Sequence, residues 1–525
     1  MQQGVFHMSY RRFCTWVGTF VFTLGASSWA LGAPRVDPAQ ALWPSLDELS
    51  VTAAIASAQA LPELAVDLDD RVDDSTVRWL ARRYGAHFVP ESSFTARDRI
   101  YRVSVSGDPQ PGRLLSLLHA LRRDPLVEAA DLQLLFHIPE SAPGSLTANE
   151  PGHRVADTAD RNNPLPSDGG QRPRLKPNDP KYRYQWHLDQ INMPEAWMLS
   201  RGAGVVVAVI DTGVTKVEDL GGTELVPGWN FVTDSENAAD DHGHGTHVAG
   251  TIAQTTDNAI GVAGVAGHAR IMPIKVLSAS GSGSVAGIAE GIRFATDHGA
   301  NVINMSLGGA VNSSVLANAV RYAHERGVVV VCAAGNDGRG RVSYPAANRG
   351  ALAVAATQFD ETTTFYSNFG KEIFIAAPGG NTRVDQNGDG VPDGVLQNTV
   401  VPGDTARQDY LGFMGTSMAA PHVAGVAALV VSQGVRDPEA VAQILKKTAR
   451  RPAHYRGKHD NHYGAGIVDA AAAVSEARSH ARKMTACQHK PRTWLFGLGL
   501  GLALLAAGVR RKLAAAPVSG NGAAL

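Results

Sequence analysis

Short apolar runs recur along the chain after residue 180, and stretches of helical periodicity lie between several of them. The runs occupy residues 205–210, 271–276, 302–305, 328–331, 352–355 and 373–376, and the helical stretches occupy 284–298 and 313–326. Continuous apolar strands that alternate with helices predict an α/β fold, in which helices cover both faces of a parallel sheet. Functional groups in such sheets gather at the carboxyl ends of the strands. We therefore expect the chemistry of this chain where these runs end.

A smaller pattern precedes this region. A strand, a helix with repeated Leu and a second strand are predicted at residues 99–105, 112–123 and 127–138. They predict a small α+β module, which we place at 34–138 and which is clearest at 99–138. Residues 34–95 show no pattern that assigns them elements. Residues 139–177 are rich in Pro, Gly, Asn, Asp and Ser, which predicts a linker.

The composition is that of an ordinary globular protein. Of 525 residues, 44% are apolar and 18% are charged, and the net charge is −1. This length allows two or three domains, and the neutral balance gives no sign of nucleic acid as a partner. The three cysteines, Cys14, Cys332 and Cys487, are too few and too scattered for a disulfide framework.

The first 33 residues have the layout of a signal peptide. Arg11 and Arg12 precede an apolar stretch, and small residues follow before Pro34. A twin-arginine signal and an uncleaved anchor are the alternatives. We expect an exported protein, located in the extracellular space, in the periplasm or on the cell envelope.

The C-terminal tail, residues 476–525, contains an apolar stretch at 494–509 that ends at Arg510, Arg511 and Lys512. Its sixteen residues would extend only about 24 Å as a helix, whereas a bilayer core is about 30 Å thick. One interpretation is a membrane attachment with the basic residues on the cytoplasmic side. The alternative is a buried helix.

Three polar residues stand at the ends of predicted elements. Asp211 follows the first apolar run, His244 lies where a Gly-rich turn enters a helix, and Ser417 begins an apolar helical stretch. Each has a plain structural explanation, since Asp often caps turns and Ser often caps helices. His242 and His247 flank His244, so a metal site is an alternative there.

Together, these three residues form a catalytic constellation. A hydroxyl needs a base within hydrogen-bonding reach to act as a nucleophile near neutral pH. Imidazole titrates in that range, and a carboxylate fixes its tautomer and stabilises the imidazolium. The chain order Asp, His, Ser is one of the known convergent orders of this triad. We expect Ser417 to be the nucleophile, His244 its general base and Asp211 the residue that orients the base.

The sequence around these residues also resembles a known family. It is similar to the three signatures of subtilisin-family serine proteases at Val-Ile-Asp-Thr-Gly (209–213), His-Gly-Thr-His-Val-Ala-Gly-Thr (244–251) and Gly-Thr-Ser-Met-Ala-Ala-Pro-His-Val-Ala-Gly (415–425). The resemblance covers residues 178–475. It implies a subtilisin-like parallel sheet and a serine endopeptidase that acts on proteins or peptides, with no cofactor for catalysis.

The resemblance also implies roles in substrate binding. Asn336 is similar to the family's oxyanion-binding Asn, with the backbone N–H of Ser417 as the second donor, and a simple turn residue is the alternative. Two edge segments would pair with an extended substrate by strand addition. Their residues are Ser306, Leu307, Gly308, Gly281 and Gly283. Backbone pairing requires a polypeptide, which favours an endopeptidase over an esterase.

We expect two structural calcium sites. Residues 385–393 place oxygen ligands at the spacing of an EF-hand-like loop, with Gly390 at the sharp turn. The expected ligands are Asp385, Asn387, Asp389, Val391 and Asp393. Leu396 stands where a bidentate Glu is usual, so a simple polar loop is the alternative. The resemblance to the family implies the second site. Its ligands would be Asp179, Asp219, Asn258 and the carbonyl of Ile260.

The N-terminal module resembles the pro-domain of this family, which assists folding, inhibits the active site and is removed at a site in the linker. An unrelated binding domain is the alternative. Two rival classes remain for the whole chain, an inactive subtilase that binds peptides and an esterase or lipase. The intact residues Asp211, His244, Asn336 and Ser417 argue against the first, and the absence of a Gly-x-Ser-x-Gly elbow argues against the second.

Overall fold

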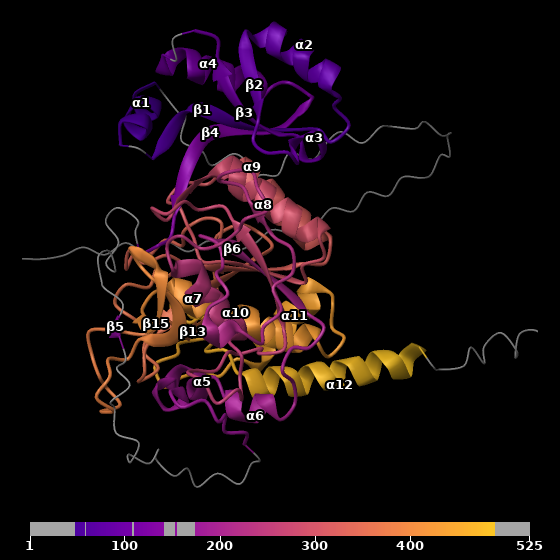
Figure 1. The fold of residues 1–525 in the computed structure, drawn as a ribbon. Coiled ribbons are helices and arrows are strands. Elements are labelled where there is room, and N and C mark those ends of the chain that lie inside the picture. The colour runs from indigo at the N-terminus through magenta and orange to yellow at the C-terminus, as the bar shows by residue number, and fades with distance from the viewer. Residues whose placement is uncertain (1–47, 58, 108–109, 141–152, 155–173, 489–525) are drawn as a thin grey trace, which may run out of the picture. The chain divides into compact units, whose positions relative to one another are not determined.

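The computed structural model describes residues 48–488, apart from residues 58, 108–109, 141–152 and 155–173 (Figure 1). All of them belong to one compact unit, Leu46–Leu525, and the other unit is Met1–Ser45. The predicted signal peptide and the apolar stretch at 494–509 therefore lie outside the described residues. Within the described residues, no helix is both long enough and apolar enough to cross a bilayer.

A seven-stranded parallel sheet forms the centre of the region after residue 200. From edge to edge its strands are β13 (Ile373–Pro378), β12 (Ala351–Thr357), β11 (Val329–Ala333), β10 (Val302–Met305), β6 (Val206–Asp211), β8 (Arg270–Lys275) and β7 (Trp229–Asn230). The six apolar runs in the sequence are six of these strands. Nearly all of their residues are buried, as parallel strands covered on both faces must be. The predicted α/β fold class is confirmed.

Helices pack in pairs against this sheet. α8 (Val285–Asp297) packs beside α9 (Ser314–Glu325), and α7 (His244–Ala253) packs beside α10 (Thr416–Val431). The hydroxyls of Ser284 and Ser313 accept backbone N–H groups in the first turns of α8 and α9, which fixes where these helices begin. The other helical elements are η2 (Tyr182–Tyr184), α5 (Trp186–Gln190), α6 (Met193–Trp197), η3 (Glu218–Leu220), α11 (Pro438–Thr448) and α12 (Ala470–Gln488). α12 continues past residue 475, where we placed the end of the catalytic region.

The N-terminal module is an antiparallel sheet in the order β2–β3–β1–β4 with helices beside it (indigo and violet in Figure 1). Its elements are α1 (Glu48–Ala56), β1 (Ala60–Leu68), α2 (Asp74–Tyr84), β2 (Ala86–Pro90), α3 (Thr95–Asp98), β3 (Ile100–Val105), α4 (Pro111–Leu121) and β4 (Val127–His137). The strand, helix and strand predicted at 99–138 correspond to β3, α4 and β4. The elements from α1 to β2 lie where the sequence pattern assigned none.

β4 extends beyond the module and joins a strand of the larger region. Its last three residues pair antiparallel with β9 (Ser282–Ser284). On its other side, His137 exchanges two backbone hydrogen bonds with Gly308, of 3.1 and 2.8 Å. The N–H of Ile138 then donates to the carbonyl of Gly281 at 2.9 Å. One strand is thus hydrogen-bonded on both sides by segments that are far apart in sequence.

Side chains also attach the module to α8 and α9. A carboxylate oxygen of Asp131, on β4, caps the first turn of α9. It accepts hydrogen bonds of 2.9, 2.8 and 3.0 Å from the hydroxyls of Ser313 and Ser314 and the N–H of Val315. Phe94 packs edge-on against Trp229 and Phe294, with ring centroids 5.0 Å apart in each pair. The contact therefore combines a capping charge with an aromatic cluster.

The predicted linker contains a short strand. β5 (His153–Arg154) pairs antiparallel with β15 (Asp404–Phe413), which forms a hairpin with β14 (Val395–Val401). The sequence pattern predicted no element within 139–177. A pairing of two residues is too short to leave a periodic pattern in the sequence, which is why this strand was missed.

Glu290 is a fully buried carboxyl group at the contact between α8 and the module. One of its oxygens accepts a 2.6 Å hydrogen bond from the hydroxyl of Thr95, and the other has no partner within the described residues. Burial raises the pKa of Glu290 to about 8; hydrogen bonds from Ser92 and Thr95 oppose the shift, and the nearby Glu91 and Asp98 add to it. Away from the module, Glu290 would titrate near its ordinary value of 4.5. Its contribution to the contact is therefore complete below that pH and is lost as the pH rises towards 8.

We expect Glu290→Gln to make the module's attachment less dependent on pH, because the amide imitates the protonated acid. Both forms are made in the full-length chain carrying Ser417→Ala, and their melting temperatures are measured by calorimetry. Between about pH 5 and pH 9, the melting temperature of the form with Glu290 should fall more than that of the Glu290→Gln form. Glu325→Gln, an exposed change on α9, is the control, and its melting temperature should vary with pH like that of the protein with Glu290 unchanged. Parallel pH profiles for all three proteins would contradict the expectation.

Candidate active site

The four predicted catalytic residues lie together at the carboxyl end of the parallel sheet. Asp211 is the last residue of β6, His244 the first of α7 and Ser417 the second of α10. Asn336 follows β11 by three residues. All four are buried. Strand ends thus position Asp211 and Asn336, and helix starts position His244 and Ser417.

Asp211 and His244 form a direct hydrogen bond. Nδ1 of His244 lies 2.8 Å from Oδ1 of Asp211, so Nδ1 carries the proton and Nε2 faces away from Asp211. The same carboxylate oxygen accepts the N–H of Thr212 at 2.7 Å, which fixes its orientation. This is the arrangement in which a carboxylate sets the tautomer of a general base.

A fifth residue, Glu140, lies between the nucleophile and the base. Ser417 Oγ donates a 2.7 Å hydrogen bond to Oε2 of Glu140, and His244 Nε2 lies 3.4 Å from the same oxygen. His244 Nε2 has no hydrogen-bond partner within the described residues. The expected direct bond between nucleophile and base is therefore replaced by a shared carboxylate. Sequence reasoning missed Glu140, which lies two residues after the end of the predicted strand 127–138.

The charge state of His244 follows from its two carboxylate neighbours. Burial alone would lower its pKa, but attraction to Asp211, the hydrogen bond to Asp211 and the proximity of Glu140 raise the pKa of His244 to about 10. At neutral pH the ring is an imidazolium in this arrangement. A protonated His244 cannot accept the proton of Ser417.

The amide of Asn336 has a fixed orientation. Its Oδ1 accepts hydrogen bonds from the N–H of Thr416 at 2.9 Å and from the hydroxyl of Thr416 at 2.7 Å. Its Nδ2 is therefore directed into the site, where it donates to Oε1 of Glu140 at 2.9 Å. Thr416 is a second residue that sequence reasoning did not single out, although it directly precedes Ser417.

The predicted substrate segments border the same site. The backbones of Gly283 and Gly308 pair with β4. The carbonyl of Gly281 accepts the N–H of Ile138, directly after β4. Ser306 donates its hydroxyl to the carbonyl of Ser417 at 2.8 Å. Leu307 is fully buried beside it. The structure thus brings together all five residues that were expected to line the groove.

Comparison with known proteins decides the family. Residues 202–466 match the model of the Subtilase family. Thermitase of Thermoactinomyces vulgaris is 40% identical over 275 residues, which cover 52% of this chain and 91% of that protein. An extracellular protease of Xanthomonas campestris is 38% identical over 349 residues, with 58% and 57% covered. The crystal structure of fervidolysin from Fervidobacterium pennivorans, a keratinolytic enzyme related to subtilisin, is similar at a TM-score of 0.59 and 25% identity, with 79% and 60% covered.

The chain belongs to the subtilase family. It is a serine endopeptidase with the subtilisin-like fold. The match covers the parallel sheet, and the predicted triad Asp211, His244 and Ser417 lies within residues 202–466 together with Asn336.

The calcium site that the family resemblance implies brings its residues together. Asp179 accepts N–H groups from Asp257 and Asn258 at 3.0 and 3.2 Å. Asp219 accepts the side-chain amide of Asn258 at 2.8 Å, and Asn258 in turn accepts the N–H of Ile260 at 2.8 Å. These oxygen donors come from three separate loops. They are the ligand type that calcium prefers.

The EF-hand-like site expected at residues 385–393 is a tightly wrapped loop. Asp385 accepts the N–H groups of Gly388 and Gly390 at 2.8 and 3.0 Å. Gly390 has φ +85°, as a sharp turn requires. Asp393 is 1% exposed, and one of its oxygens accepts the N–H of Gln386 at 2.6 Å. Its other oxygen is buried and has no partner within the described residues, so an acceptor is available to a cation.

The three clustered histidines of the sequence do not share one site. His247 donates its Nε2–H towards the carbonyls of Val395 and Leu411, 3.0 and 3.1 Å away, and its ring stacks on Phe413. Burial lowers the pKa of His247 to about 3, so the ring is neutral. Among the described residues there is no group of three or more His, Cys, Asp or Glu side chains placed to hold a metal.

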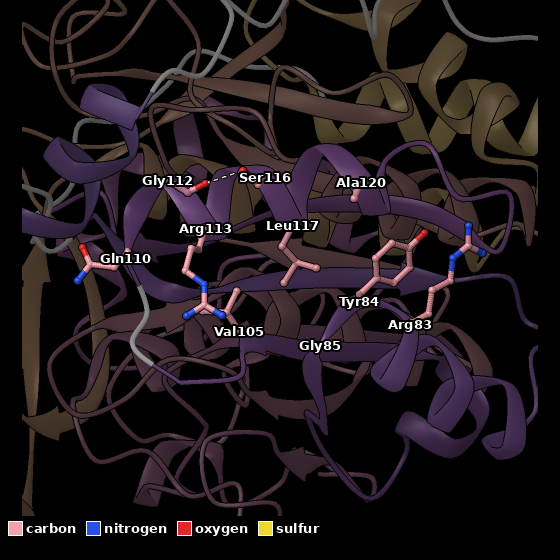
Figure 2. Close-up of a pocket in the computed structure, with 10 residues that line it drawn as sticks. All are labelled: Arg83, Tyr84, Gly85, Val105, Gln110, Gly112, Arg113, Ser116, Leu117 and Ala120. Carbon is pink, nitrogen blue, oxygen red and sulfur yellow. Dashed lines mark hydrogen bonds between the residues drawn. The ribbon is translucent and has the colours of Figure 1, made fainter.

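A hollow on the N-terminal module is separate from these residues. Figure 2 shows that Arg83 and Tyr84, near the end of α2, face it together with Arg113 and Leu117 of α4. None of the predicted site residues lines it. The hollow is therefore no part of the candidate active site.

We expect Asn336→Ala to lower kcat far more than it raises KM, because the amide would meet charge that develops only in the transition state. In subtilisin, removal of the corresponding donor raises the activation free energy by about 2.7–4 kcal/mol. Steady-state kinetics on a soluble peptide measure both constants. Asn461→Ala, at an exposed position, is the control. An unchanged kcat with a raised KM would assign Asn336 to binding.

Proposed function

We propose that this endopeptidase is exported as a precursor, that Ser417 is its nucleophile and that the precursor processes itself. The observation that carries the proposal is the joint placement of Asp211, His244, Asn336 and Ser417 around one point at the end of the sheet. A strand of the N-terminal module lies in the adjoining groove, where an extended substrate would bind.

The mechanism follows from these positions once Glu140 has left. Ser417 Oγ attacks the carbonyl carbon of the scissile peptide bond, and His244 Nε2 takes its proton. Asn336 Nδ2 and the N–H of Ser417 bind the oxyanion that develops. His244 then gives its proton to the leaving amine, which leaves an acyl-enzyme on Ser417. Water, deprotonated by His244, hydrolyses the ester and restores the hydroxyl.

The module at 34–138 acts as the pro-domain in this proposal, and residues 139–177 contain the processing site. β4 binds the groove through backbone hydrogen bonds on both edges, which any extended chain of suitable side chains would also make. Such a strand is a competitive inhibitor for as long as the module remains attached. Removal of residues before the catalytic region then frees the groove.

Export is supported by the N-terminal sequence. Arg11 and Arg12 followed by an apolar stretch are typical of a signal peptide. One similar protein is itself described as an extracellular protease. A secreted peptidase also benefits from delayed activation, because an active enzyme would digest proteins of the cell that makes it.

Structural calcium is part of the proposal. Asp179, Asp219, Asn258 and Ile260 would hold one ion, and the loop 385–393 would hold another through Asp385, Asn387, Asp389, Val391 and Asp393. The unpartnered buried oxygen of Asp393 supports the second site. Bound calcium would supply positive charge to carboxylates that share a small volume, and it would contribute no step of the reaction.

We expect Ser417→Ala to abolish peptidase activity and to leave the full-length chain uncut, because the nucleophile that would make the first cut is gone. Casein digestion and the mass of the purified chain are the measurements. Ser116→Ala, an exposed change on α4, is the control and should mature normally. Normal digestion of casein by the Ser417→Ala protein would overturn the assignment of the nucleophile.

We also expect calcium to raise the melting temperature of the Ser417→Ala precursor. A ligand that binds only the folded state at a hundredfold excess over its Kd adds about 2.7 kcal/mol. Asp393→Asn and Asp179→Asn should each remove part of the increase, while Asp404→Asn, on the exposed part of β15, should keep all of it. If calcium and a chelator give the same melting curve, both sites are absent.

A further inference from the structure

The end of β4 carries a side chain into the centre of the active site. His137 is fixed by two hydrogen bonds to Gly308, and Ile138 by one to Gly281, so the next two residues must reach Ser417. Pro139 has no N–H, and the backbone pairing along the groove ends at Ile138. Beyond that point the group in contact with Ser417 Oγ is the carboxylate of Glu140.

Both oxygens of that carboxylate are bound by groups that the reaction needs. Oε1 accepts from Asn336 Nδ2 at 2.9 Å, and Oε2 accepts from Ser417 Oγ at 2.7 Å. Gly415 lines the same space, and a Cβ on Gly415 would collide with Oε1. The negative charge thus occupies the position where the oxyanion of a substrate would form. Charge-assisted hydrogen bonds of this kind are stronger than those between neutral groups.

The carboxylate also changes the state of the base. Ser417 directs its proton to Glu140 and not to His244, whose Nε2 lies 3.4 Å from Oε2. Asp211 on one side and Glu140 on the other favour the imidazolium form of the ring. The carbon of an ionised carboxylate is a poor electrophile, so Ser417 does not attack the group that it contacts.

We propose that Glu140 is an inhibitory residue of the precursor, whose side-chain carboxylate blocks the oxyanion position and lies between Ser417 and its base His244. The inhibition comes from a side chain and adds to the occupation of the groove by β4. Maturation then requires Glu140 to leave Ser417, so its carboxylate sets the rate at which the precursor is activated. This inference rests on the proposed roles of Ser417 and of the N-terminal module.

The test uses full-length precursors with Glu140→Gln, Glu140→Ala and Glu140→Asp. Glu128→Gln is the matched control, since Glu128 is an exposed acid at the other end of β4. Each protein is exposed briefly to a fluorescent fluorophosphonate, and the label on the uncut band is measured on a gel. Conversion to mature enzyme is followed in parallel. N-terminal sequencing and kcat/KM of the mature enzymes complete the comparison.

We expect the uncut Gln and Ala forms to be labelled about tenfold faster than the wild type, as the loss of one charge-assisted interaction implies, and to mature faster. Glu140→Asp keeps the charge on a shorter side chain that cannot reach both Asn336 Nδ2 and Ser417 Oγ. The labelling rate of its precursor should therefore lie between those of the wild type and the Ala form. Glu128→Gln should match the wild type. The mature enzymes should be equal, because the linker that carries residue 140 has been removed.

Equal labelling of the wild type, Gln and Ala precursors, together with equally active mature enzymes, would overturn the role of Glu140 and leave the proposed function intact. If the Gln and Ala forms fail to fold, the Glu140→Asp form takes their place. Labelling of its precursor at the wild-type rate, together with a mature enzyme of normal activity, would equally overturn the role of Glu140. Absence of labelling and of activity in every protein, the wild type included, would instead overturn the proposed function, and the inference with it.

Discussion

The arrangement of the active site depends on the backbone pairing of β4. This strand belongs to the antiparallel sheet of the N-terminal module through β1, and its last residues are hydrogen-bonded to β9 on one side and Gly308 on the other. Because a strand in a ladder has a fixed register, the positions of Pro139 and Glu140, directly after it, are constrained as well. Pro139 ends the ladder, and Glu140 consequently lies against Ser417. A shift by one residue would direct another side chain there.

The electrostatics of the site follow from that register. Asp211, His244 and Ser417 are all buried, so interactions between their charges are screened little by water. A second carboxylate beside His244 therefore has a large effect on its proton, and the same group satisfies the Asn336 amide, which is fixed by Thr416. One side chain thus occupies both the proposed base and the proposed oxyanion donor. No change in the sheet or the helices is needed.

The sequence predicted the catalytic region well, because parallel strands are buried on both faces and leave continuous apolar runs, and because the residues at their ends lie in distinctive motifs. It predicted less of the module. β1 and α2 lie in a stretch whose pattern we did not assign, and β5 is a pairing of only two residues. Glu140 was missed for another reason: its meaning comes from a partner 277 positions away, and an acid at the start of a polar linker carries no local signal.

Cutting the linker does not by itself open the site. A break in the chain after Glu140 removes none of the hydrogen bonds that β4 makes with β9 and Gly308, and it leaves Asp131 on the first turn of α9. A cleaved module would therefore still occupy the groove until these contacts are lost together. The groove contacts use backbone groups and vary little with pH, whereas Glu290 at α8 is buried as a neutral acid and becomes costly to keep there as the pH rises. If the module is the proposed pro-domain, a rise in pH would weaken its attachment at α8, whereas Glu140 acts directly on Ser417 and His244.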